Sequence, residues 1–166
     1  MGEGRVRAFQ GQSDLPGDCH PEIALIADYW RSIHPESGLP GRQHFDPVDV
    51  PPKLLPSIRL LDVVGDPPRF RIRLMGTKMV AAIGRDHTGR WLDEVFAGFE
   101  KSSACLGLDT VVRTGQLNWR RGHPALLYGK EFMTIERIYL PFARDGRTVD
   151  MILSYVMLGD SDGKMF

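Results

Sequence analysis

The chain has 166 residues, of which 42% are hydrophobic and 25% charged, the composition of one ordinary globular domain. Lys plus Arg equals Asp plus Glu at 21 each, so no net charge favours nucleic acid or an anionic membrane surface. Cys19 and Cys105 lack the spacing of a zinc site or a disulfide framework. No apolar run approaches the ~20 residues that span a bilayer. We therefore expect a cytoplasmic protein that binds neither nucleic acid nor membrane.

The first third of the chain predicts an arm, a helix and a connector. Residues 1–19 are rich in Gly, Gln, Ser and Asp, which is typical of a flexible arm. Apolar residues then recur at helical spacing until Pro35, which predicts an amphipathic helix. Prolines and glycines interrupt residues 39–52, where we expect an ordered connector. Residues 20–54 are thus expected to form an N-terminal helix and a Pro-rich connector.

Two neighbouring runs predict a β-hairpin. Residues 58–64 are rich in β-branched and aliphatic side chains, whereas residues 69–75 alternate arginine with apolar residues, as in a strand with one buried face. The intervening residues 65–68 are Gly, Asp, Pro and Pro, which favour a turn. The alternation predicts that one face of the second strand buries Phe70, Ile72 and Leu74, and that the other presents Arg69, Arg71 and Arg73.

The rest of the chain predicts helices followed by strands. Residues 76–114 fit short helices with a longer one over about 98–114, and strands are predicted over residues 116–121, 131–142 and 147–158. In the last strand one face carries Val149, Met151, Leu153, Tyr155 and Met157. This order of elements predicts an α+β fold with one antiparallel sheet.

The Gly- and Asp-rich block 84–96 and the strand-and-turn segment 136–146, in this order of elements, resemble the PAS domain family over residues 55–158. The preceding segments 29–30, 39–42, 45–47 and 54–56 are similar to the lead-in of a bacterial PAS subfamily that often occurs as a nearly bare domain. The resemblance implies a PAS fold, with a five-stranded antiparallel sheet, helices on one face and an N-terminal amphipathic helix that contributes to dimer contacts. It also implies signalling, with residues 55–158 as the PAS core and 159–166 as a polar C-terminal tail.

The sequence does not identify a cofactor. Cys105 lies in Ser-Ser-Ala-Cys-Leu-Gly rather than in the motif of flavin-adduct PAS domains, and residues 98–114 contain no histidine of the kind that haem-binding relatives use. His87, in the preceding turn, is the nearest candidate, although a histidine there is more often a surface or capping residue. The five histidines lack metal-ligand spacing, so no metal site is expected. The cofactor stays unknown.

The sequence also contains no recognisable catalytic motif. A nucleophile elbow and a phosphate-binding loop are both missing. The adjacent Asp93 and Glu94 would point about 100° apart on a helix, so they would not share a site. We therefore expect a non-catalytic protein. An enzyme without a recognisable motif, and a sensor with bound haem or flavin, are the alternatives.

Three sets of side chains are candidates for function, each with a structural alternative. Bulky and adaptable side chains suit a ligand cavity between sheet and helices, or a solid core; they are Met79, Ile83, Trp91, Phe96, Trp119, Met133, Met151 and Tyr155. The apolar stripe of the first helix suits a homodimer seam, or packing on its own sheet; it consists of Ile23, Ile26, Trp30 and Ile33. The exposed arginines of the second strand suit an acidic partner or anionic ligand, or a solvated face.

These observations together predict a non-catalytic PAS sensor or adaptor in bacterial signal transduction. It would act through protein-protein association, as a homodimer or with a signalling partner. A small-molecule ligand in the cavity between sheet and helices would tune that association.

Overall fold

The computed structural model describes residues 7–10, 15–126 and 132–166. In these residues the strands form one antiparallel sheet in the order β1-β4-β5-β6-β2-β3. The strands are β1 Arg7–Gln10, β2 Ile58–Val64, β3 Arg69–Met75, β4 Asn118–Gly122, β5 Thr134–Phe142 and β6 Met151–Gly159. The five-stranded sheet expected from the sequence is confirmed in β2 to β6.

β1 is a sixth strand that the sequence analysis did not predict. The sequence predicted a flexible arm over residues 1–19, but the backbone of β1 pairs with β4, with Arg7 opposite Arg121 and Gln10 opposite Asn118. An unpaired strand edge offers a row of free N–H and C=O groups to any nearby extended chain. The remaining residues of the arm before position 15 lie outside the described residues.

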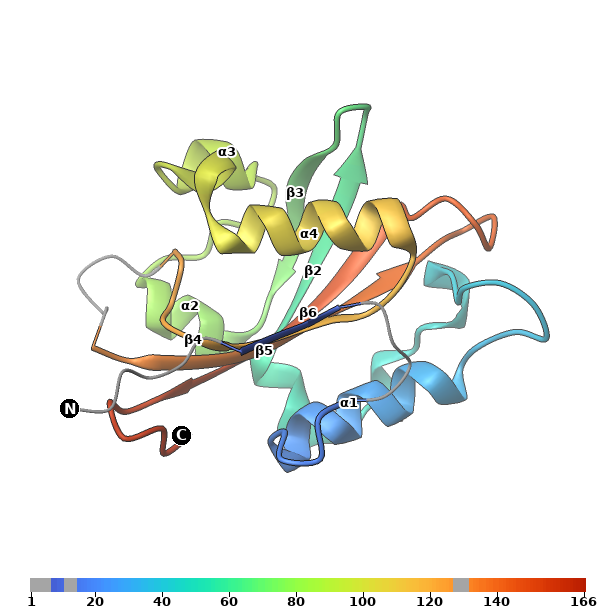
Figure 1. Ribbon diagram of the computed structural model, residues 1–166. Coiled ribbons are helices and arrows are strands. Elements are labelled where there is room, and N and C mark those ends of the chain that lie inside the picture. Colours follow the sequence, from blue (N-terminus) through green and yellow to red (C-terminus); the bar gives the residue numbers. More distant parts are fainter. Residues whose placement is uncertain (1–6, 11–14, 127–131) are drawn as a thin grey trace.

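Helices cover both faces of the sheet (Figure 1). One face carries α2 Thr77–Ile83, α3 Leu92–Val95, the 3-10 turn η4 Phe99–Lys101 and α4 Ser103–Thr114. The opposite face carries α1 Pro21–Ser32 and a connector with three 3-10 turns, η1 Arg42–His44, η2 Pro47–Asp49 and η3 Pro52–Ser57. We call these the helix side and the α1 side. The helices expected within residues 76–114 and the ordered connector are both confirmed.

α1 packs on the sheet of its own chain. Its Ile23, Ile26 and Trp30 are buried in the core of the α1 side, Ile33 is half-buried against the same core, and the Trp30 Nε1 donates to the Pro141 carbonyl at 2.9 Å. The prediction that these four residues form a homodimer seam is therefore wrong, because the sheet already covers this stripe. Packing on its own sheet, the alternative, is what the structure shows.

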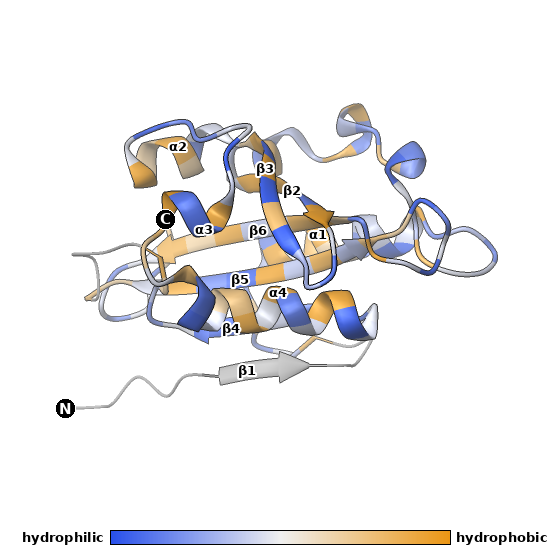
Figure 2. Ribbon diagram, turned by 90° about the horizontal axis from the view of Figure 1, so that it is seen from above, coloured by the Kyte–Doolittle hydropathy of each residue, from blue (hydrophilic) through white to orange (hydrophobic). Residues whose placement is uncertain are grey.

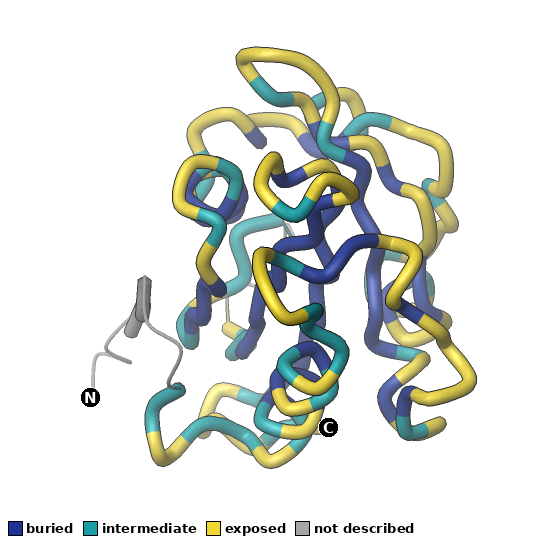
Figure 3. Tube along the Cα trace, turned by 90° about the vertical axis from the view of Figure 1, so that its right-hand side faces the viewer, coloured by how far each residue is buried: buried dark blue, intermediate teal, exposed yellow. Residues whose placement is uncertain are grey.

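Because both faces are covered, the central strands are buried on both sides (Figure 3). Met151, Leu153, Tyr155 and Met157 of β6 lie in the core of the α1 side, as their alternation predicts. The intervening Ile152, Ser154 and Val156 are also buried, since they face the helix side. Val149 differs from the prediction, because it precedes β6 and lies in the core of the helix side.

A β-bulge changes the predicted pattern of β3. Phe70 and Ile72 are buried as expected, but Leu74 is largely exposed and Met75 is buried instead. Leu60 pairs with Leu74 and the next residue, Leu61, with Ile72, so Arg73 is an extra residue in the ladder. One extra residue shifts the alternation by one position, which turns Leu74 away from the helix side.

The packing of α1 predicts that truncating two neighbouring side chains of equal size, Leu25 and Ile26, lowers the free energy of unfolding by very different amounts. Ile26→Ala should lower the free energy of unfolding by about 2–5 kcal/mol, because it leaves a cavity in the core. The matched control Leu25→Ala should cost less than about 1 kcal/mol, since Leu25 is partly exposed on the outer side of α1. Urea denaturation measures both. A loss at Ile26 that varies with protein concentration would instead indicate a seam between two chains.

Candidate functional site

A cavity of about 40 Å³ lies on the helix side, between the sheet and helices α2 and α4. Most of its lining is apolar. The lining residues are Arg59, Met79, Ile83, Phe96, Ser103, Ala104, Arg120, Ala125, Leu126, Ile135, Arg137, Tyr139 and Val156. Figure 2 shows hydrophilic stretches on β3, on β4 and in the middle of β5 beside α4, whereas β6 is largely apolar. The cavity therefore has an apolar roof of helix residues and a floor that contains arginine.

Three strands supply the three arginines of the floor. Arg59 lies on β2, Arg120 on β4 and Arg137 on β5, and Arg120 is directly opposite Arg137 in the ladder. All three face the helix side, because side chains alternate along a strand and their neighbours Leu60, Trp119 and Ile138 face the α1 side. Arg59 and Arg137 are each only 4% exposed. Fully buried arginine is uncommon unless it is paired.

The partners of these arginines are neutral. The Arg137 Nη1 donates to Oδ1 of Asn118 at 2.7 Å, and its guanidinium lies 3.8 Å from the centre of the Tyr139 ring. The Arg120 Nη1 donates to the carbonyl of His123 at 2.9 Å. The Arg59 Nε has no hydrogen-bond partner among the described residues, and neither has Oγ of Ser154, the residue opposite Arg59 in the ladder. These are two unsatisfied buried polar atoms at adjacent positions.

Burial destabilises the charged form of all three guanidinium groups. It lowers the pKa of Arg59 and of Arg120, and it lowers the pKa of Arg137 to about 10, with repulsion from Arg120 and Arg59 acting in the same direction. The Tyr139 side chain raises the pKa of Arg137 and partly offsets these effects. Arg137 is still protonated at neutral pH, so the floor of the cavity is cationic.

Gly107 of α4 permits the close approach of this helix to the arginines. A methyl group added at Gly107 would lie 2.6 Å from Nη2 of Arg137 and 3.0 Å from Oδ1 of Asn118. Carbon and nitrogen atoms that are not bonded do not approach so closely, so a side chain here would displace the guanidinium. The glycine thus sets the distance between α4 and the floor of the cavity.

The predicted ligand residues divide between several places. Met79, Ile83 and Phe96 line the cavity, and Met133 lines a neighbouring pocket of about 340 Å³ that shares Met79 with it. Trp119, Met151 and Tyr155 do not belong to this set, because they face the α1 side and pack beneath α1. That part of the prediction is wrong, since a covered sheet gives buried residues on both faces and their spacing does not tell the faces apart.

The prediction that Trp91 lines the ligand cavity is also wrong. Trp91 is half-buried at the start of α3, beside the edge strand β3, where the guanidinium of Arg69 lies 4.2 Å from its ring centre. It does not line the cavity. A bulky aromatic residue before a short helix is equally suited to covering a sheet edge, and here it does so.

The exposed arginines of β3 bind carboxylates of their own chain. Arg69 holds Asp93 with two hydrogen bonds of 2.8 Å, and Arg73 binds Asp62 at 2.7 Å. Arg71 also reaches Asp62, at 3.4 Å. The hypothesis that this row binds an acidic partner is therefore weakened, because its charges are already matched.

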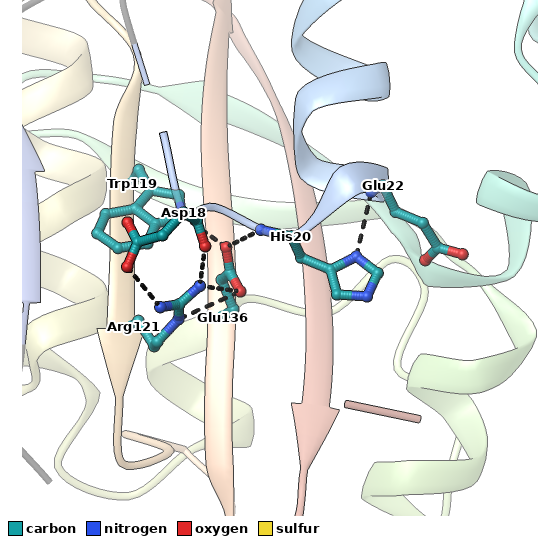
Figure 4. Close-up of polar contacts among 6 residues, drawn as sticks. All are labelled: Asp18, His20, Glu22, Trp119, Arg121 and Glu136. Atoms are coloured by element: carbon teal, nitrogen blue, oxygen red, sulfur yellow. Dashed lines mark hydrogen bonds and ion pairs between the residues drawn. The ribbon is translucent and has the colours of Figure 1, made fainter. Parts of the chain in front are cut away.

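A second polar cluster, on the α1 side, anchors the start of α1 (Figure 4). The carboxylate of Glu136, which is fully buried, accepts hydrogen bonds from the His20 backbone N–H at 2.8 Å, the Trp119 Nε1 at 3.0 Å and the Arg121 guanidinium at 3.0 Å. The Tyr155 hydroxyl donates to the carboxylate of Glu22 at 2.8 Å. These contacts are satisfied within the chain, which suits a structural role.

The described residues offer no alternative centre for metal or thiol chemistry. No group of three or more His, Cys, Asp or Glu in this part of the chain could hold a metal ion. The Cys105 thiol is partly buried and close to Asp109, which raises its pKa to about 11. It stays protonated at neutral pH and is a poor nucleophile there.

A family model described as a PAS domain matches residues 19–157. The chain belongs to the PAS domain family. No curated protein and no solved structure matches it. Membership indicates a sensor or signalling role, and the match includes α1 and the connector as well as the strands and helices that follow. Across the described segments, no helix has the length and apolar character needed to cross a membrane.

The residues that sequence reasoning missed are Arg59, Arg120 and Arg137. Each follows or precedes apolar residues in a strand that is buried on both faces, as in Ile-Arg-Leu-Leu at Arg59. A single charged residue in an apolar strand is the signal that would have indicated Arg59, whereas Arg120 and Arg137 each stand beside a second charged residue, Arg121 and Glu136, and resemble an ordinary polar stretch. Finding this signal requires knowing that both faces are covered.

The close packing at Gly107 predicts that Gly107→Ala lowers the stability of the protein, which is the opposite of the usual effect of this substitution in a helix. Gly→Ala within a helix normally stabilises a protein by roughly 0.5–1 kcal/mol. Gly107→Ala should instead destabilise by about 1–3 kcal/mol, because Arg137 is buried and bound to Asn118 and cannot easily move. Urea denaturation gives the sign directly, and a stabilised variant would show that the guanidinium is not held there.

Proposed function

We propose that this PAS domain is a non-catalytic sensor or adaptor in bacterial signal transduction, which binds a small molecule in the helix-side cavity and acts through protein association. The observation that carries the proposal is a pair of buried polar atoms without a hydrogen-bond partner among the described residues: the Nε of Arg59, which lines the cavity, and the Oγ of Ser154, the residue opposite Arg59 in the ladder. Buried polar groups in proteins are nearly always hydrogen-bonded to protein, water or ligand. A bound molecule would supply the missing partner.

The chemistry of the cavity supports binding without turnover. Its described lining contains no carboxylate, histidine or cysteine. These are the side chains that most often act as general acid, general base or nucleophile in enzymes. A site that offers guanidinium groups and apolar surface can hold a molecule in place, and the only other polar side-chain groups of its described lining are the hydroxyls of Ser103 and Tyr139.

The association part of the proposal needs a surface other than the stripe of α1. An apolar groove of about 450 Å³ lies on the α1 side of the β2–β3 hairpin, and Phe45, Leu55, Leu60 and Leu74 contribute to it. Leu74 faces outward here because of the bulge at Arg73. Exposed apolar surface of this kind commonly marks a contact with another protein. We propose that two copies of the chain meet at this groove.

Strand β2 contributes residues to both the helix-side cavity and the apolar groove. Its Arg59 lines the cavity, whereas its neighbours Ile58 and Leu60 line the groove on the opposite face. A ligand that fixes the Arg59 side chain would therefore act on a strand whose other face contributes to the association surface. Such coupling requires only that the strand has two packed positions with different affinity for the ligand.

Filling the cavity tests ligand binding. Ala104→Leu places a larger side chain against the cavity, so a metabolite that raises the melting temperature of the wild-type protein should have no such effect on the variant. Leu106→Ala, an exposed change on the same helix, is the control and should keep the response. Lack of response to a broad metabolite panel would count against a ligand. A visible absorbance band in the purified protein would favour haem or flavin instead.

Sedimentation equilibrium tests association. The wild-type protein should be a dimer at micromolar concentration, and Leu74→Arg should make it a monomer, because a positive charge in the groove would lose its water in the dimer and would be repelled by Arg42, which lines the same groove. The melting temperature should change little, since Leu74 is largely exposed in the single chain. A wild-type protein that stays monomeric would contradict the homodimer, and a dimer unaffected by the substitution would place the contact elsewhere.

A further inference from the structure

We infer that the ligand of the helix-side cavity is a small organic carboxylate, whose head group is bound by Arg59, Arg120 and Arg137. The inference rests on the proposed ligand-binding function and adds the chemical class of the ligand. It is carried by the contrast between these three buried arginines and the arginines at the surface of the same sheet.

Three exposed or half-buried arginines of the sheet have carboxylate partners, whereas Arg59, Arg120 and Arg137 have none in the part of the chain that the structure describes. Arg69 binds Asp93, Arg73 binds Asp62, and Arg121 binds the buried Glu136. Among the described residues, no acidic side chain lines the cavity, and neither Arg59 nor Arg137 has an ion pair. Buried charges are expected to be paired or bound to counter-ions, because removing them from water is costly. Within residues 7–10, 15–126 and 132–166, the cavity therefore has buried positive charge without a matching carboxylate.

The three arginines also retain unused donors. Arg59 makes no side-chain hydrogen bond within the described part of the chain, and its Nε is fully enclosed. Arg120 uses Nη1 for the His123 carbonyl, and Arg137 uses Nη1 for Asn118. A guanidinium has five N–H donors in a planar fork that matches the two oxygens of a carboxylate. These three residues, on strands β2, β4 and β5, line one small cavity.

Size and lining favour a carboxylate over phosphate. The cavity of about 40 Å³ holds roughly three water-sized groups, since each needs about 10–15 Å³, and a carboxylate head has three heavy atoms. Apart from the arginines the lining is mostly apolar, including Met79, Ile83, Phe96 and Leu126, and its other hydroxyl-bearing residues are Ser103 and Tyr139. Phosphate carries more charge and four oxygens to satisfy. The head group of an organic acid would occupy this cavity, and its hydrocarbon part would extend toward the neighbouring pocket of about 340 Å³, which shares Met79 and Val156 with the cavity.

The test compares carboxylates with their uncharged amides. The melting temperature of the wild-type protein is measured with acetate, hexanoate, succinate and benzoate, each beside the corresponding amide, and with inorganic phosphate, while chloride keeps the ionic strength constant. At least one carboxylate should raise it by about 5–10 °C at about 100 times its dissociation constant, and its amide should not. The Nε–Hε resonance of Arg59 in ¹⁵N spectra should shift with the same ligand.

Arg59→Met is the decisive variant. It removes a buried charge without a carboxylate partner and keeps much of the side-chain volume, so the ligand-free protein should melt at a higher temperature while its response to the carboxylate is lost. Arg73→Met, the same change at an exposed arginine, should keep the response. If Arg59→Met does not fold, Arg120→Met and the Arg59 resonance of the wild-type protein serve the same purpose.

The outcomes separate this inference from the proposed function. A response to uncharged molecules that Ala104→Leu abolishes, without a response to carboxylates, would overturn the carboxylate and leave a ligand-binding sensor. A stronger response to phosphate would overturn the carboxylate class. Equal carboxylate responses in wild type, Arg59→Met and Arg73→Met would mean adventitious binding at the surface and overturn the site. No response to any molecule would overturn both.

Discussion

The covering of both faces of one sheet is the constraint on which the rest of the structure depends. Because α1 and the connector pack on one side and α2 to α4 on the other, most residues of the central strands β5, β6 and β2 are buried, whichever way they point. Positions that would be solvated in a sheet with one open face become buried polar sites here. The arginines of the cavity floor and the carboxylate of Glu136 are the consequences of this arrangement on opposite faces.

The two buried polar clusters differ in how they are satisfied. Glu136 receives donors from the backbone of His20, from Trp119 and from Arg121, so its charge is compensated within the chain and it fixes α1 to the sheet. On the other face, Arg59 and Ser154 are left with unsatisfied atoms. A buried polar cluster whose atoms are all hydrogen-bonded within the chain is typical of a structural role. A buried polar atom without a hydrogen-bond partner calls for an explanation, and a bound molecule would provide one. This difference is the reason for our proposal that the arginine cluster binds a ligand, whereas the Glu136 cluster anchors α1.

Much of the fold could be predicted from sequence. Local sequence patterns determine three elements that appear where expected. They are the alternating strand over residues 69–72, the turn over residues 65–68 and the apolar stripe of α1. The partner of the α1 stripe could not be predicted, because an apolar face looks the same whether a second chain or its own sheet covers it. The β-bulge that turned Leu74 outward depends on pairing between β2 and β3, which no single strand shows.

The site was predicted in part for the same reason. Met79, Ile83 and Phe96 belong to segments that only the helix side accommodates, and they line the cavity. Trp119, Met151 and Tyr155 are equally apolar but belong to the other face of the strands. Arg59, Arg120 and Arg137 become informative only when their register brings them together beneath α4, since separately each resembles an ordinary strand residue.

A crystal structure of the protein, grown with the carboxylate that raises its melting temperature most, tests the binding site most directly. We expect a carboxylate oxygen within hydrogen-bond distance of the Arg59 Nε, with Arg120 and Arg137 around the same head group. A cavity closed by its own side chains, with Arg59 paired to a carboxylate of the protein, would contradict it.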